Sequence, residues 1–223
     1  MSRPASRKRV VVLASGRGTN LQALIDAGND PDFPAQVAAV IANRPGALAL
    51  DRAREAGIAH RVVDHTKYRD RAGHEAEVVA AIDAAEPDIV CLAGYMRVLS
   101  ADFVGRYRGR MINIHPSLLP LFPGLHTHER ALAAGVKIHG ASVHFVTESV
   151  DEGPIIAQAA VPVLPGDDAG TLGGRVLAAE NRLYPLALAL VARGAARIDG
   201  GSAAISMTAE TGAQVLFSPA NLR

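Results

Sequence analysis

Short apolar runs alternate with helix-like segments along the first half of the chain, and this alternation limits the fold more than any other feature. The segments between the runs place apolar residues on one helical face, as Leu21, Leu24 and Ile25 do. Strands that alternate with helices form a parallel sheet with right-handed crossovers. Such strands are predicted at residues 9–14, 36–42, 61–63 and 88–93.

The second half of the chain is richer in strands, which adds an antiparallel edge to the predicted sheet. Strands are predicted at residues 111–115, 138–147 and 155–163. Helices are predicted at residues 45–56, 67–86, 101–107, 126–134 and 169–192. The fold class is therefore α/β, with a Rossmann-like, mostly parallel sheet, helices on both faces and an antiparallel edge.

No linker or repeat divides the chain, so a single domain is predicted over residues 1–223. Residues 1–8 are predicted to form a solvated basic arm, and residues 194–223 a C-terminal tail. Within this tail the pattern indicates one hairpin, in which residues 203–207 pair with residues 214–217.

The composition argues against several classes of protein. The formal net charge is +1, which gives no strong overall field for nucleic acid or a membrane. No apolar run approaches the roughly 20 residues of a membrane span. Cys91 is the only cysteine, so the chain has no internal disulfide and no thiol pair for zinc. We expect a cytoplasmic protein without nucleic-acid or membrane partners; its oligomeric state stays open, with a homodimer as one option.

A glycine loop, Ser15-Gly16-Arg17-Gly18-Thr19-Asn20, joins the first strand to the first helix. This arrangement presents backbone N–H groups to an anion at a helix N-terminus. Leu21 stands where a dinucleotide fingerprint needs its third glycine, and the Lys-Ser/Thr of a Walker loop is absent. A single phosphate monoester is the best-fitting ligand, and a tight turn without a ligand is the alternative.

Asn113 and His115 end a predicted strand that two prolines, Pro116 and Pro120, then interrupt. Residues two apart in a strand point to the same face, so the amide and the imidazole should lie side by side at the carboxyl end of the strand. Such a pair suits chemistry at a carbonyl, and the alternative is a polar pair that caps the strand. Asp151 is a candidate partner for His115, although a plain turn residue is the alternative for it too.

Neither metal chemistry nor a serine nucleophile is predicted. The spacing of the histidines matches neither His-Glu-x-x-His nor a Cys/His zinc pattern, and Gly-x-Ser-x-Gly is absent. Five histidines nevertheless cluster in the second half of the chain, at His115, His126, His128, His139 and His144.

Several longer motifs occur in an order that resembles one known family. They are SGRGTNLQAL at 15–24, LAGYMRVL at 92–99, NIHPSLLP at 113–120, GLHTH at 124–128, GASVHFVT at 140–147, VDEGPIIAQ at 150–158 and ENRLYP at 180–185. Together they resemble the phosphoribosylglycinamide formyltransferases, which are folate-dependent enzymes of purine synthesis. The resemblance covers residues 9–193 and implies the formyltransferase fold.

The resemblance also implies roles for individual residues. The implied catalytic residues are Asn113, His115 and Asp151. The residues implied to bind glycinamide ribonucleotide, with its phosphate near the glycine loop, are Gly18, Thr19, Asn20 and Glu180. The implied folate-binding residues are Arg71, Met96, Arg97, Val98, Leu99 and Asn113. Two positions depart from the family pattern, because Asn181 replaces a commonly seen histidine and Leu177 stands where a polar phosphate contact can occur.

The implied reaction transfers the formyl group of 10-formyltetrahydrofolate, a co-substrate, to the amine of 5'-phosphoribosylglycinamide in de novo purine (IMP) biosynthesis, without a metal. We expect Asp151 to hold His115 as an imidazolium that stabilises an oxyanion together with Asn113. The alternatives are a formyltetrahydrofolate hydrolase, a methionyl-tRNA formyltransferase and a non-catalytic nucleotide-binding module. The first two typically carry a further terminal domain, for which we expect no room here.

Overall fold

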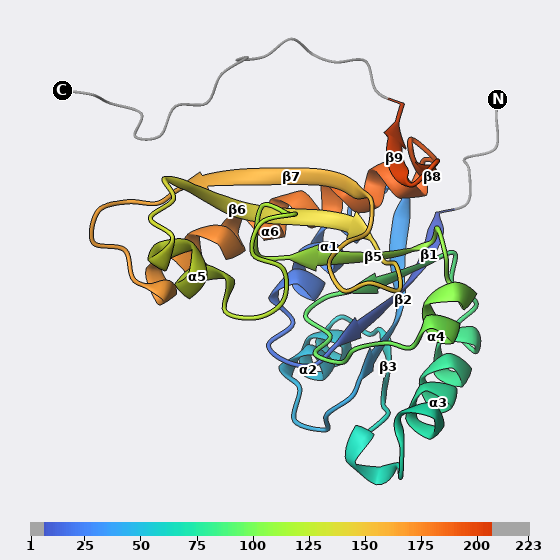
Figure 1. Cartoon of the computed structure of the whole chain (residues 1–223). Coiled ribbons are helices and arrows are strands. Elements are labelled where there is room, and N and C mark those ends of the chain that lie inside the picture. The colour runs from blue at the N-terminus through green and yellow to red at the C-terminus, as the bar shows by residue number, and fades with distance from the viewer. Residues whose placement is uncertain (1–6, 207–223) are drawn as a thin grey trace.

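The computed structural model describes residues 7–206, and a seven-stranded sheet forms its centre (Figure 1). The strand order is β3-β2-β1-β4-β5-β6-β7. The strands are β1 (Lys8–Ala14), β2 (Ala35–Ala42), β3 (Ala59–Val62), β4 (Ile89–Leu92), β5 (Met111–His115), β6 (Ile138–Phe145) and β7 (Ile155–Pro162). A separate two-stranded sheet pairs β8 (Ala196–Asp199) with β9 (Ser202–Ile205).

The directions of the strands confirm the predicted sheet. Neighbouring strands from β3 to β5 are parallel, whereas β5 pairs with β6 and β6 with β7 in antiparallel fashion. The chain leaves β1 toward β2 on one side and later returns to β4 on the other. Open α/β sheets bind ligands at such a switch point, at the carboxyl ends of the strands. The glycine loop follows β1 at this edge.

Helices cover both faces of the sheet, as predicted, and β1 is buried between them. Val10 and Val12 pack in one apolar cluster with residues of α1, α2 and α6, whereas Val11 and Leu13 pack in a second cluster with residues of α3 and α4. All four side chains are fully buried, and each such burial stabilises the fold by about 1.5–3 kcal/mol. The helices are α1 (Thr19–Gly28), α2 (Leu48–Glu55), α3 (Arg71–Asp83), α4 (Ala101–Arg106), α5 (Thr127–Ala133) and α6 (Ala169–Ala192).

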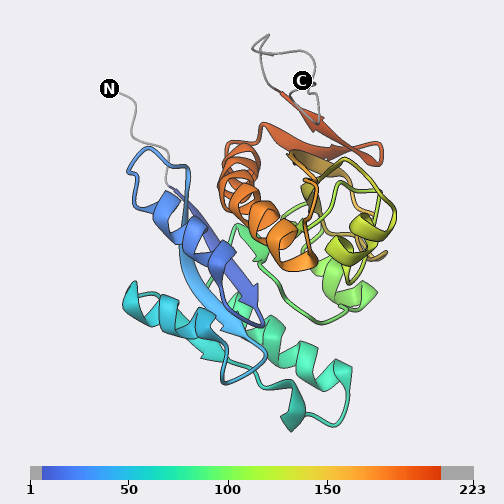
Figure 2. The same cartoon turned by 90° about the vertical axis from the view of Figure 1, so that its left-hand side faces the viewer.

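Helices α1 and α6 lie side by side on one face of the sheet (Figure 2). Asp168 caps α6 by accepting a hydrogen bond from the Thr171 N–H, and Ser100 caps α4 in the same way. Among the described residues 7–206, no helix is long and apolar enough to cross a membrane.

The structure corrects the predicted helix at residues 67–86. A short 3-10 turn, η1 (His65–Lys67), comes first, and α3 begins only at Arg71. Tyr68 and Asp70 are extended, and the Asp70 carboxylate accepts a hydrogen bond from the Gly73 N–H. A cap of this kind fixes where a helix begins, so the charged run before Asp70 stays outside the helix.

The two ends of the domain also differ from the predictions. Lys8 already belongs to β1, and the Arg7 guanidinium donates hydrogen bonds to the carbonyl oxygens of Gly28 and Ala35, so residues 7 and 8 are part of the folded domain. The tail prediction missed β8: the strand expected near residue 203 is observed as β9, and it pairs with β8. The predicted partner segment, residues 214–217, lies outside the described residues.

Candidate active site

Asn113 and His115 lie on one face of β5 and meet the same group of side chains. The antiparallel register places Asn113 opposite His144 and His115 opposite Ser142. The Asn113 Nδ2 is 3.1 Å from the His144 Nε2, and the His115 Nδ1 is 3.2 Å from the Asp151 Oδ2. The His144 Nε2 is in turn 3.7 Å from the Asp151 Oδ1. The alternation of strand side chains therefore brings the amide and the imidazole together, as the sequence predicted.

Asp151 reaches this group from the turn between β6 and β7. Its backbone has φ of 58°, a left-handed conformation that is uncommon outside glycine and is concentrated at functional sites. The Gly124 N–H donates a 2.8 Å hydrogen bond to the Asp151 Oδ2. Gly153 allows the turn to pack closely on β6, because a Cβ there would lie 1.7 Å from the Phe145 carbonyl oxygen.

Asp151 and His115 both have altered pKa values. Burial by itself raises the pKa of Asp151, but the neighbouring His144 ring, the Gly124 N–H and the neighbouring His115 ring outweigh it, and the net pKa is lowered. The Asp151 carboxylate is therefore ionised at neutral pH. Its negative charge favours the protonated form of His115.

The structure corrects the expectation that Asp151 holds His115 as an imidazolium in the free protein. Burial lowers the pKa of His115 below 6.5, although the Phe122 carbonyl and the Asp151 carboxylate both act to raise it. The His115 Nε2 is 3.0 Å from the Phe122 carbonyl oxygen, so both ring nitrogens face acceptors. At neutral pH the ring is uncharged, and a proton that it gains would find a hydrogen-bond partner at either nitrogen.

His144 belongs to this site, and the sequence analysis named it only as one of five clustered histidines. Its side chain is 2 % exposed, and its Nδ1 is 2.9 Å from the Phe145 carbonyl oxygen, which can only accept. The ring proton therefore sits on Nδ1, and Nε2 accepts from the Asn113 Nδ2. This bond fixes the orientation of the Asn113 amide. The sequence did place His144 on a predicted strand. It did not show which residue of β5 pairs with His144, because that register joins segments distant along the chain.

The glycine loop forms the second part of the site. Gly18 occupies the N-cap position of α1 with φ of 69° and provides no side-chain cap, so the first N–H groups of α1 have no capping side chain. A Cβ at Gly18 would lie 2.7 Å from the Cα of Ala49. The glycine loop is linked to the loop that follows β4, because the Ser15 hydroxyl accepts a hydrogen bond from the Met96 N–H.

Glu180 connects the glycine loop to α6. The Asn20 Nδ2 donates a 2.8 Å hydrogen bond to the Glu180 Oε2, and the glutamate is 6 % exposed. Burial raises the pKa of Glu180, and the Asn20 hydrogen bond offsets only part of this effect. The predicted nucleotide-binding residues Gly18, Thr19, Asn20 and Glu180 are therefore gathered at one end of α1.

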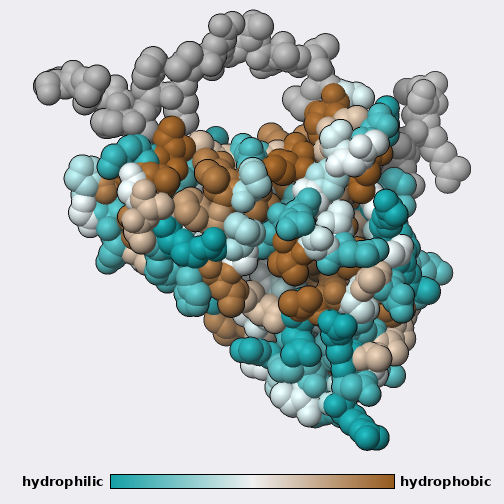
Figure 3. All heavy atoms as spheres, in the orientation of Figure 1, coloured by the Kyte–Doolittle hydropathy of each residue, from teal (hydrophilic) through white to brown (hydrophobic). Residues whose placement is uncertain are grey.

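The predicted folate-binding residues come from two segments that Glu75 joins. The Arg71 Nε is 4.0 Å from one Glu75 oxygen, and this carboxylate also accepts from the Ser100 N–H directly after Leu99. The pairing of Leu92 with Asn113 places the loop of residues 94–99 beside the catalytic candidates. Hydrophobic side chains gather in the middle of the face in Figure 3, in front of β5. Exposed apolar residues on the loops around the site are Met96, Val98, Leu121, Leu125 and Val150.

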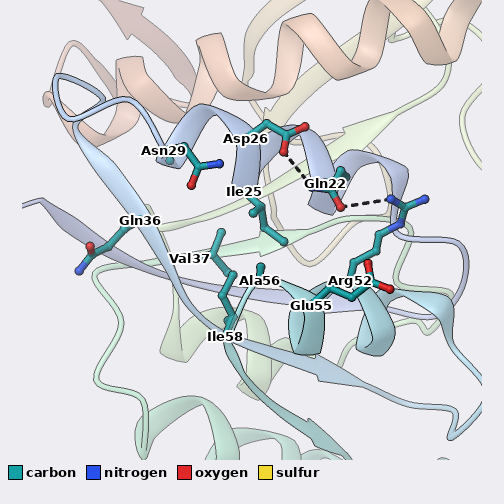
Figure 4. A pocket seen from close by; sticks show the side chains of 11 residues that line it. Gln22, Ile25, Asp26, Asn29, Gln36, Val37, Arg52, Glu55, Ala56 and Ile58 are labelled. Atoms are coloured by element: carbon teal, nitrogen blue, oxygen red, sulfur yellow. Dashed lines mark hydrogen bonds between the residues drawn. The ribbon is translucent and has the colours of Figure 1, made fainter.

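Two cavities lie on either side of α1. One of about 390 Å³ is bounded by α1, β2 and α2, and Figure 4 shows Ile25, Val37 and Ile58 lining it. The other, of about 650 Å³, lies between α1 and α6 and begins at Thr19. The second cavity therefore adjoins the glycine loop, whereas the first is set apart from Asn113 and His115. Within residues 7–206, no group of three histidine, cysteine, aspartate or glutamate residues is arranged to hold a metal ion.

Comparisons with known proteins show the family of the chain. The formyl transferase family matches residues 8–188. The chain is 48% identical over 185 residues to a phosphoribosylglycinamide formyltransferase of Escherichia coli, and the match covers 83% of this chain and 87% of that protein. A glycinamide ribonucleotide transformylase structure from Symbiobacterium toebii aligns with a TM-score of 0.87 and 47% identity, over 89% of this chain and 94% of that chain.

Longer relatives contain the same unit within a larger protein. The chain is 53% identical over 194 residues to a trifunctional purine biosynthetic protein of Drosophila melanogaster; the match covers 86% of this chain but only 14% of that protein. The chain thus spans about one seventh of this relative's length. The family match, the E. coli relative and the common fold lead to one conclusion: the chain belongs to the formyl transferase family, among the phosphoribosylglycinamide formyltransferases.

Proposed function

We propose that the chain transfers the formyl group of 10-formyltetrahydrofolate to the amine of 5'-phosphoribosylglycinamide. The observation that carries this proposal is the convergence of Asn113, His115 and Asp151 at the end of β5, beside a loop suited to one phosphate. The phosphorylated sugar would lie between the glycine loop and Glu180, which points its carboxylate at Asn20. The folate would lie against the loop of residues 96–99, with Arg71 and Arg97 toward its acidic tail.

In the proposed reaction the amine nitrogen bonds to the formyl carbon, and the bond from that carbon to N10 of the folate breaks. One proton leaves the amine and one proton arrives at N10, so the products are the formylated nucleotide and tetrahydrofolate. The neutral His115 ring accepts the amine proton, and the resulting imidazolium, held by the Asp151 carboxylate, returns a proton to the leaving nitrogen.

The tetrahedral intermediate carries negative charge on the former formyl oxygen. The Asn113 amide and one N–H of the His115 imidazolium would donate hydrogen bonds to it, while the Nδ1–H stays on the Asp151 carboxylate. Preorganised donors of this kind are worth several kcal/mol in a site that excludes water. His144 acts as a positioning residue in this scheme, because it accepts from Asn113 and so holds the amide in one orientation.

An assay with and without the amine substrate tests the proposed function. The purified chain is incubated with 10-formyltetrahydrofolate alone and then with 5'-phosphoribosylglycinamide added. We expect formyl loss only when the nucleotide is present, with equal amounts of formylated nucleotide and tetrahydrofolate. Formyl loss without the amine would instead identify a hydrolase, and no loss under either condition would identify a non-catalytic binding module.

Two further expectations accompany this proposal. The buried, free Cys91 thiol suits the reducing cytoplasm, where the relatives' small-molecule substrates would be available. The homodimer stays a prediction, and light scattering of the purified chain measures its mass in solution.

A further inference from the structure

The groove between α1 and α6 contains a cation that the proposed mechanism does not use. The groove has a volume of about 650 Å³ and runs from Thr19, in the first turn of α1, toward Ala27. Residues of α6 form its other wall, among them Asn181, Arg182 and Pro185. Because Thr19 belongs to the glycine loop, a group bound at that loop would lie next to this end of the groove.

Arg182 differs from Arg52, the other arginine that lines this groove, and from Arg175 on the same helix. Its side chain is exposed, and no hydrogen bond or ion pair within residues 7–206 engages its guanidinium. Arg52 lines the same groove but donates to the Arg17 carbonyl oxygen and to the Gln22 Oε1, an interaction drawn in Figure 4. Arg175, two turns earlier on α6, makes two hydrogen bonds to the Asp167 carboxylate. Arg182 is thus the groove cation that is available to a ligand.

The direction of the helix sends Arg182 toward the glycine loop. Side chains on an α-helix lean toward its N-terminus and cover the preceding turn. Glu180, two residues earlier and on the buried face of α6, is bonded to Asn20 in the first turn of α1, so this part of α6 lies level with that turn. An extended Arg182 side chain therefore approaches the level of Thr19 and Asn20, where the N–H groups of α1 begin.

The amino-acid types on this wall of α6 leave a phosphate with few other partners. Leu177 cannot donate a hydrogen bond, and Asn181, one turn later, is uncharged. The first turn of α1 contains no basic residue. A phosphate dianion here would meet the backbone N–H groups, the Thr19 hydroxyl and the exposed Arg17 of the glycine loop itself. A cation from α6 would add a charged partner on the side of the groove.

We propose that Arg182 is that cation: it reaches along the α1–α6 groove and binds the 5'-phosphate of the ribonucleotide. This inference rests on the proposed function and adds a specificity-determining residue to it. A planar guanidinium donates two parallel hydrogen bonds to a phosphate, so Arg182 would select the phosphorylated substrate over the corresponding ribonucleoside.

Steady-state kinetics with two substrates test the inference. Arg182→Ala is compared with the unaltered chain on 5'-phosphoribosylglycinamide and, at high enzyme concentration, on the same compound without its phosphate. We expect kcat/KM for the phosphorylated substrate to fall about tenfold, equivalent to about 1.4 kcal/mol, mainly through KM. We expect less than a twofold change for the dephosphorylated substrate and for the KM of the formyl-folate.

Two more variants complete the design. Arg193→Ala removes an exposed arginine from the C-cap of the same helix and should leave both substrates unaffected. Arg182→Lys keeps the charge and should recover part of the lost affinity. Equal losses on both substrates, or a change below twofold on the phosphorylated one, would overturn the role of Arg182. Failure of the unaltered chain to formylate either substrate would instead contradict the proposed function.

Discussion

The His115 Nδ1 lies 3.2 Å from the Asp151 Oδ2, and both side chains are at least nine-tenths buried. The pair joins the end of β5 to the turn that follows β6, two segments that are distant along the chain. Burial lowers the pKa of the imidazole while the carboxylate opposes that effect. The ring is therefore uncharged at neutral pH, yet it has a fixed anion ready to stabilise an added proton, which is what a group that both accepts and returns a proton requires.

Replacing Asp151 with asparagine should remove this support without changing the size of the side chain. We expect kcat to fall at least about 100-fold, or about 2.7 kcal/mol, because the imidazolium form of His115 loses its anionic partner. Steady-state kinetics measure the effect, and thermal unfolding checks that the variant is folded. Activity within about tenfold of the unaltered chain would reject the proposed role of Asp151.

His144→Leu tests whether His144 acts through Asn113. The variant removes the acceptor that orients the amide, so we expect kcat to fall about tenfold, or about 1.4 kcal/mol, with little change in the KM of the nucleotide. In a double-mutant cycle, His144→Leu should add little loss to Asn113→Ala, since the group that it positions is already gone. Independent, additive losses would mean that His144 acts on something other than Asn113.

Gly18→Ala should disturb the glycine loop. The new Cβ would lie 2.7 Å from the Cα of Ala49, and φ of 69° disfavours any residue other than glycine. We expect about 1–3 kcal/mol of destabilisation and a higher KM for the nucleotide. Gly16→Ala in the same loop is the matched control, because a Cβ there meets nothing within 4 Å. Denaturant unfolding and nucleotide kinetics should separate the two variants; equal behaviour would contradict the steric argument.

His139 should make the fold sensitive to mild acid. Its side chain is fully buried beside His128, and burial lowers its pKa from 6.5 to about 4. The unfolded chain therefore binds the proton more readily than the folded one. Above pH 6.5 the free energy of unfolding is not reduced by this group, and it falls as the pH drops from 6.5 toward 4. The slope contributed by one such group reaches about 1.4 kcal/mol per pH unit.

Urea unfolding at a series of pH values measures this slope. His139→Leu cannot take up the proton, so its stability should depend less on pH between 6.5 and 4. His60→Leu is a suitable control, because His60 lies exposed on β3, at the edge of the sheet. An unchanged slope in His139→Leu would show that other groups govern the acid sensitivity.

Local patterns determined most of the fold. The uninterrupted apolar run at residues 9–14 predicted the strand that is observed as β1. The helices predicted at residues 101–107 and 169–192 are observed as α4 and α6, and their caps, Ser100 and Asp168, act within one turn. The placement of Asn113 and His115 on one face followed from the two-residue period of a strand. These features depend on neighbours a few residues apart, which is why the sequence alone sufficed for them.

Tertiary structure decided how the site is completed. The antiparallel register of β5 and β6 brought His144 to Asn113, and the turn at Asp151 depends on the close packing of Gly153 against Phe145.

The charge state of His115 was beyond the reach of any local pattern. A carboxylate beside a histidine suggested an imidazolium, but the sequence does not state how far water is excluded from the ring. The pKa reflects the sum of desolvation and every charge that surrounds the group, and only the assembled fold fixes that sum. The sequence therefore determined which residues could carry out the chemistry, and the packing of distant segments around them decided their orientation and protonation.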